Sequence, residues 1–126
     1  MGRILTALAG ALALFSALPA IASAQDAAQG RTVFQTNCAM CHQAVNNGRS
    51  IIGPNLFGIV GRRAGSAPGF AYSSAMQHSS ITWTSAQLLA YVQAPARAIP
   101  GNRMPYAGLH NPQQAAALVA FLATLH

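Results

Sequence analysis

This chain of 126 residues contains no lysine and no glutamate, and Asp26 is its single acidic side chain. Its positive charge comes from seven arginines, which give a formal net charge of +6. A basic balance can indicate binding to nucleic acid, to an anionic membrane surface or to an acidic protein partner. Because the arginines are scattered and lysine is absent, nucleic-acid binding is disfavoured. An acidic protein partner fits the charge pattern best.

Cysteine is also scarce, and the two cysteines stand in one motif, Cys38-Ala39-Met40-Cys41-His42. A zinc site needs four ligands, usually from two such pairs, and a thioredoxin-like pair expects a preceding strand that the sequence does not predict. Two thiols at this spacing can add to the two vinyl groups of a haem, and the histidine that follows can bind the iron. The motif therefore predicts covalent attachment of one haem c through Cys38 and Cys41, with His42 as an axial ligand.

Residues 1–24 have the features of a secretory signal peptide. One positive charge precedes an apolar run that is short for a membrane span, and small residues end the segment at Ala24. We therefore expect cleavage after Ala24, a periplasmic location and no stable membrane insertion, with an uncleaved anchor as the alternative. Residues 25–126 suffice for one small domain, and a haem would supplement its modest apolar core.

Three segments carry helix signals. A capping residue and an apolar face predict a first helix over residues 26–37. A capping pattern at Thr84 predicts a second helix that stops before Pro95. Asn111, a following proline and apolar residues at helical spacing predict the last helix. Gly30 weakens the first helix, so it either marks a close crossing by another helix, for which the last helix is the expected partner, or is merely tolerated.

From residue 25 to its end, the chain resembles the class I cytochromes c, close to bacterial cytochromes c2 and their mitochondrial relatives. The motifs that carry this resemblance are CAMCH at 38–42, GPNLFGIVGRRAG at 53–65, PGFAYSSAM at 68–76, ITW at 81–83 and IPGNRM at 99–104. The resemblance implies an all-α fold with one haem. In that fold the N- and C-terminal helices cross, and loops and short helices enclose the haem.

The resemblance also implies roles for individual residues. It makes His42 and Met104 the two iron ligands, and it has the carbonyl of Pro54 accept the Nδ1 proton of His42. Tyr91 matches a tyrosine that approaches the methionine sulfur. The residues that surround or hydrogen-bond the haem propionates would be Arg62, Tyr72, Ser73 and Trp83. Their donors and positive charge would offset the cost of burying two carboxylates.

The chain departs from the family pattern at three positions. Asn102 and Arg103 stand where the family usually has threonine and lysine before the methionine. Met76 stands where asparagine is common, so we expect a drier haem pocket and a reduction potential toward the high end for His/Met ligation. His78 and His110 are the rival iron ligands, and either would lower that potential.

Together these features predict a soluble, monomeric, periplasmic carrier that transfers one electron at a time and is not an enzyme. Ligation by both His42 and Met104 would leave no open iron position for a substrate. Its partners would be redox proteins with an acidic docking surface. Two other functions remain open: a haem subunit bound permanently to a larger oxidoreductase, and a haem enzyme or sensor in which Met104 is labile.

Overall fold

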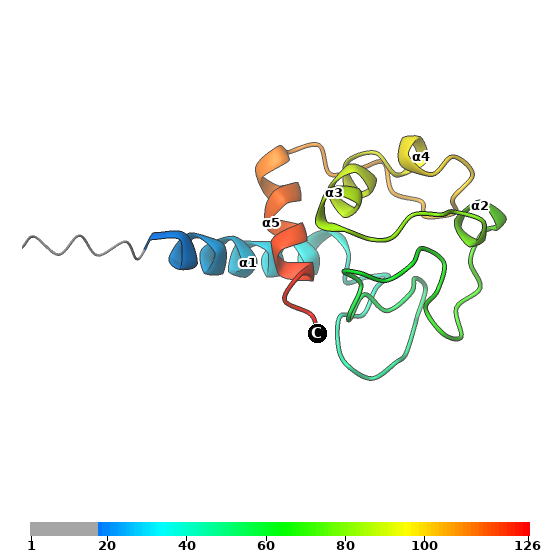
Figure 1. The fold of residues 1–126 in the computed structure, drawn as a ribbon, viewed down its shortest axis with the longest axis horizontal. Coiled ribbons are helices and arrows are strands. Elements are labelled where there is room, and N and C mark those ends of the chain that lie inside the picture. The colour runs from blue at the N-terminus through cyan, green and yellow to red at the C-terminus, as the bar shows by residue number, and fades with distance from the viewer. Residues whose placement is uncertain (1–17) are drawn as a thin grey trace, which may run out of the picture.

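The computed structural model describes residues 18–126, and helices are the regular elements of that part of the chain (Figure 1). They are α1 (Leu18–Asn37), α2 (Ser74–Gln77), α3 (Ser85–Gln93), α4 (Pro95–Ala98) and α5 (Pro112–Leu122). A single β-bridge between Arg63 and Thr82 is the β pairing found there. The predicted all-α fold is confirmed. None of the described helices combines the length and the apolar character that a membrane span requires.

Helix α1 begins earlier than predicted. The expected helix covered residues 26–37, whereas α1 already begins at Leu18. Alanine is the best helix former and is frequent in the added turns, and Pro19 stands in the first turn, where its missing amide proton costs little. The helix therefore runs through the predicted cleavage site after Ala24. The rest of the predicted signal peptide, residues 1–17, lies outside the described residues.

Helices α1 and α5 come from opposite ends of the chain and cross each other (Figure 1). At the crossing, a Cβ on Gly30 would overlap the carbonyl group of Ala117 and would lie 2.7 Å from the Cβ of Phe121. The rings of Phe34 and Phe121 pack with their centroids 5.6 Å apart, and Leu118 is 2% exposed. The prediction that Gly30 marks a close helix crossing is confirmed.

Helices α3 and α5 begin at the predicted caps. The side chain of Thr84 accepts a hydrogen bond of 3.2 Å from the amide of Gln87, and that of Asn111 accepts one of 3.0 Å from the amide of Gln114. Helix α3 ends before Pro95 as expected. Pro95 then begins α4, because proline suits the first position of a helix as well as it stops the preceding one.

Side-chain hydrogen bonds organise the irregular segment between α1 and α2. Asn55 is 6% exposed, and its Nδ2 donates to the carbonyl of Val45 at 2.9 Å and to Oδ1 of Asn47 at 3.0 Å. Its Oδ1 accepts from the amide of Phe57 at 2.9 Å. These bonds join two stretches of the loop and hold it in one shape without regular secondary structure.

Helix α2 is a single turn with a buried methionine. The Oγ of Ser73 caps it by accepting a hydrogen bond of 3.1 Å from the amide of Met76. The side chains around Met76 in the sequence are polar, but Met76 is 8% exposed and belongs to the apolar core. Gly65 allows this packing, because a Cβ there would lie 2.8 Å from the carbonyl oxygen of Met76.

Candidate haem-binding site

The two cysteines lie on a turn that continues directly from α1. The amide of Cys38 donates to the carbonyl of Phe34 at 2.8 Å, and the amides of Cys41 and His42 donate to the carbonyl of Cys38 at 3.0 and 2.9 Å. Both thiols are free and half-buried. Burial, and secondly the neighbouring Cys41, raises the pKa of Cys38 to about 11. The turn thus gathers both thiols and the imidazole at the end of one helix, as a single attached haem requires.

The imidazole of His42 is held by the Gly53-Pro54 segment. Its Nδ1 lies 2.8 Å from the carbonyl oxygen of Pro54. A carbonyl can only accept, so Nδ1 carries the proton and Nε2 is left as the basic nitrogen. Burial lowers the pKa of His42, which favours the neutral form that binds metals. Gly53 lies against the ring, because a Cβ there would be 2.5 Å from Cε1.

Arg62 lies half-buried beside the loop organised by Asn55. Its guanidinium donates to the carbonyl of Asn55 at 2.8 Å and to that of Phe57 at 3.3 Å. Burial lowers the pKa of Arg62, and the adjacent Tyr72 acts in the opposite direction. A guanidinium has five N–H donors, so these two bonds leave others for an anionic group such as a propionate.

The other residues predicted around the propionates lie near Arg62. The hydroxyl of Tyr72 accepts a hydrogen bond of 3.1 Å from the amide of Ala67, and that of Ser73 accepts the cap bond of α2. Each hydroxyl keeps its own proton to donate. The amide of Trp83 donates to the carbonyl of Arg62 at 2.9 Å. These residues fit the donor set that two buried carboxylates need.

Tyr91 and Met104 meet at a common neighbour. The rings of Trp83 and Tyr91 pack with centroids 5.0 Å apart, and burial raises the pKa of Tyr91 to about 12. The Tyr91 hydroxyl donates to Oδ1 of Asn102 at 3.4 Å, and the amide of Met104 donates to the same oxygen at 2.9 Å. Met104 is half-buried against the apolar core. The structure therefore brings Tyr91 and the Met104 loop together.

Tyr106 locates this loop relative to the attachment motif. Its amide donates to the carbonyl of Met104 at 2.9 Å. Burial, and secondly the nearby Cys38, raises the pKa of Tyr106. The segment that carries Met104 therefore lies within electrostatic range of Cys38, and both pack against the same apolar core. The sequence carries no signal for this proximity, because Tyr106 and Cys38 are far apart along the chain.

Two further residues of the site were not predicted as site residues. Asn55 is preceded by a Gly-Pro turn and accepts the amide two residues ahead, which is the local bonding typical of asparagine in turns and could have marked it. Asn102 stands out in the sequence only as a departure from the family pattern. The rival ligands His78 and His110 are exposed, and the Nδ1 of His78 lies 2.8 Å from the carbonyl of Ser74.

Comparisons with known proteins agree with this geometry. The family model for cytochrome c matches residues 27–126. A cytochrome c from Chlamydomonas reinhardtii is 45% identical over 101 residues, which cover 80% of this chain and 90% of the relative. A cytochrome c2 from Rhodomicrobium vannielii is 41% identical over 126 residues, which cover 100% of this chain and 98% of the relative. The solved structure of cytochrome cH from Methylobacterium extorquens is 36% identical with a TM-score of 0.72, covering 79% of this chain and 98% of its own. This chain therefore belongs to the cytochrome c family, as a class I c-type cytochrome.

Proposed function

We propose that this cytochrome c is a free periplasmic electron carrier whose haem iron is bound by His42 and Met104. Membership of the family makes it an electron-transfer protein with one haem c, attached at Cys38 and Cys41, rather than an enzyme. The observation that carries the proposed ligation is the 2.8 Å hydrogen bond between His42 and the carbonyl of Pro54. It fixes the tautomer in which Nε2 carries no proton and can bind iron.

Met104 is proposed as the second ligand because its loop is anchored and passes near the attachment motif. Its amide is held by Asn102, and the next tyrosine along the loop lies near Cys38. Bound haem supplies a one-electron couple, and a histidine with a methionine raises its potential relative to two nitrogen ligands. With His42 and Met104 both bound to the iron, no iron position would be left for a substrate.

Four residues are proposed to hold the haem propionates. They provide one guanidinium, two hydroxyls and an indole N–H from elements that meet around Arg62: Arg62, Tyr72, Ser73 and Trp83. Buried carboxylates are costly unless they gain donors and a positive partner. Arg62 is already oriented by two backbone carbonyls, so it would lose little conformational freedom on binding an anion.

The periplasmic location rests on the predicted signal peptide. The first turns of α1 extend away from the rest of the molecule (Figure 1), and Ala24 is exposed. The packed part of α1, from Gly30 to Phe34, begins after the proposed cleavage site. Cleavage after Ala24 would therefore leave the helix crossing intact.

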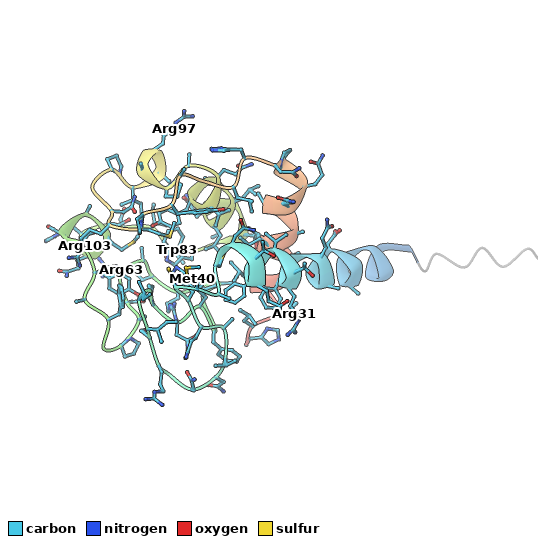
Figure 2. The ribbon with its side chains drawn as sticks, turned by 180° about the vertical axis from the view of Figure 1, so that it is seen from behind. Arg31, Met40, Arg63, Trp83, Arg97 and Arg103 are labelled. Carbon is cyan, nitrogen blue, oxygen red and sulfur yellow. The ribbon has the colours of Figure 1, made fainter. Side chains whose placement is uncertain are left out.

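The proposed partners are redox proteins with acidic contact surfaces. Met40 is 85% exposed and Ile52 is 71% exposed, and a hydrogen bond of 2.7 Å from the amide of Gly53 to the carbonyl of Cys41 holds their segments together. Exposed apolar side chains therefore stand in the attachment motif and in the segment bonded to it. Exposed arginines lie on several elements around the molecule (Figure 2): Arg31, Arg63, Arg97 and Arg103. Carboxylates on a partner would be attracted to this surface, and the on-rate would fall with added salt. The carrier is proposed to act as a monomer.

The test of this proposal is the absorption spectrum of the purified protein, oxidised and reduced. We expect c-type bands on reduction and, in the ferric protein, the weak near-infrared band of iron bound to methionine sulfur. Met104→Ala should abolish that band, whereas Met40→Ala, a matched change at an exposed methionine, should preserve it. Absence of the band from the parent protein, or its survival in Met104→Ala, would refute the ligation and favour a haem with a labile or different sixth ligand.

The location and the partner chemistry have separate tests. Mass spectrometry of protein exported to the periplasm should give a chain that begins at Gln25. Association with a physiological redox partner should slow as ionic strength rises. A mature protein that retains residues 1–24, or an association rate insensitive to salt, would contradict the respective part of the proposal.

A further inference from the structure

Four hydrogen bonds meet at Asn102 and hold the loop that carries Met104. The Nδ2 of Asn102 donates to the carbonyl oxygens of Pro95 and Ile99, each at 2.9 Å. Its Oδ1 accepts from the amide of Met104 at 2.9 Å and from the hydroxyl of Tyr91 at 3.4 Å. One side chain thus connects α3, both ends of α4 and the loop.

The chemistry of the amide group matches these four partners. A primary amide has two N–H donors and one oxygen with two lone pairs, and each of these is used at Asn102. Threonine, which the family usually has at this position, has a single O–H donor and could not donate to the carbonyls of Pro95 and Ile99 together. Aspartate would place negative charge against both carbonyl oxygens and supply no donor.

Arg103 tethers the other side of the same loop. Its guanidinium donates to the carbonyl of Ala71 at 2.8 Å, across 32 residues of sequence. The arginine is exposed, so water can replace this bond at little cost. Asn102 is half-buried. Without its side chain the amide of Met104 would lose its acceptor, whereas the carbonyls of Pro95 and Ile99 would keep their bonds from backbone amides.

We propose that Asn102 is the positioning residue that keeps the Met104 loop closed over the haem iron, and so sets how often Met104 leaves it. This inference rests on the proposed ligation by Met104. Asn102 touches neither haem nor iron in this proposal, and it acts by holding the amide of Met104 against α3 and α4. Opening the loop requires the bond between these two residues to break, while the bonds to Pro95 and Ile99 keep the asparagine in place as the acceptor.

The expected effect follows from the bonds that are lost. Without the Asn102 side chain the closed state loses its link between the loop and the helices, which is worth one or two hydrogen bonds, so the open fraction should rise roughly tenfold or more. An added ligand that binds only the open form then binds more tightly by the same factor, because its apparent affinity scales with the open fraction.

The experiment measures binding of imidazole to the ferric holoprotein, together with the near-infrared methionine band and far-UV circular dichroism. Asn102→Ala should bind imidazole roughly tenfold or more tightly than the parent while its helical signal is retained. Asn37→Ala is the matched control, because it removes a 3.0 Å hydrogen bond to the carbonyl of Val33 within α1 and none of the bonds that hold the Met104 loop. Its imidazole affinity should equal that of the parent.

The outcomes separate this inference from the proposed ligation. A parent protein without the methionine band would overturn the ligation, and the inference with it. A parent with the band and an Asn102→Ala variant of unchanged imidazole affinity would overturn the inference alone, as would an equal gain in Asn37→Ala. If Asn102→Ala fails to acquire haem, Asn102→Thr decides, because threonine cannot donate to the carbonyls of Pro95 and Ile99 together and so holds its acceptor less firmly against the Met104 amide. An affinity clearly above that of the parent supports the inference, and an equal affinity overturns it.

Discussion

Replacing Gly30 by alanine should destabilise the protein, although alanine is the better helix former. In an exposed helix the change would stabilise by about 1 kcal/mol. Here the new Cβ would overlap the backbone carbonyl of Ala117 and approach the Cβ of Phe121 to 2.7 Å. Neither group can rotate away, so α1 and α5 must separate.

The magnitude follows from these opposing effects. Overpacking of a closed interface costs about 1–3 kcal/mol. The upper end applies because the new Cβ would overlap backbone atoms and would disturb the Phe34–Phe121 contact. After subtraction of the gain in helix propensity, we expect a net loss of about 2 kcal/mol. For a domain of this size that lowers the melting temperature by about 8–16 °C.

The assay is thermal and urea unfolding of the ferric holoprotein, followed by circular dichroism at helix wavelengths. Ala28→Gly is the control, because Ala28 is exposed on the same helix and its replacement should cost about 1 kcal/mol through propensity alone. If Gly30→Ala unfolds at the same urea concentration as the parent, or at a higher one, the close crossing described above is wrong.

Three further predictions concern the core and the loop. Asn55→Ala should lower the free energy of unfolding by about 2–3 kcal/mol, because it removes three hydrogen bonds and leaves the amide of Phe57 without its acceptor; a loss under 0.5 kcal/mol in urea titration would contradict this. Leu118→Ala should cost about 2–5 kcal/mol through the cavity it leaves, whereas Ala116→Gly, at an exposed position of α5, should cost about 1 kcal/mol. The pKa of Tyr91 lies at about 12, above its ordinary value of 10, so unfolding releases a proton between these pH values. The contribution of Tyr91 to the free energy of unfolding is therefore fully present below pH 10. As the pH rises toward 12, up to about 2 kcal/mol of it is lost. Tyr91→Phe should remove this part of the alkaline loss, and an identical pH profile of unfolding for parent and variant would refute the assignment.

The elements that the sequence predicts well are those set by local hydrogen bonds. The starts of α3 and α5 follow from Thr84 and Asn111, whose side chains bond to amides three residues ahead. The sequence also marks Gly30 as a candidate crossing point, because glycine weakens a helix and a close helix contact is one explanation for its presence there. The sequence does not predict the start of α1, since a run of alanines is typical both of a signal peptide and of a helix. The burial of Met76 depends on tertiary packing, which overrides the polar character of its neighbours.

The site divides in the same way. The attachment motif can be read directly from Cys38 to His42, and the bond from His42 to Pro54 follows from the family resemblance. The family pattern also marks Tyr91, whose hydroxyl bond to Asn102 appears only in the structure. The sequence does not identify Asn102 as a site residue, because its partners lie on α3, α4 and the loop and are adjacent only in the folded chain. Its role follows from the number of bonds it makes.

The contact between α1 and α5 also imposes an order of events on the maturing protein. Its two halves are far apart along the chain, so they cannot pair until α5 has been synthesised. In the packed chain, burial raises the pKa of Cys38 to about 11, which leaves little of the reactive thiolate. We therefore expect haem to react more readily with a chain in which Cys38 is not yet buried. A chain that packed around Cys38 first would offer haem the less reactive thiol.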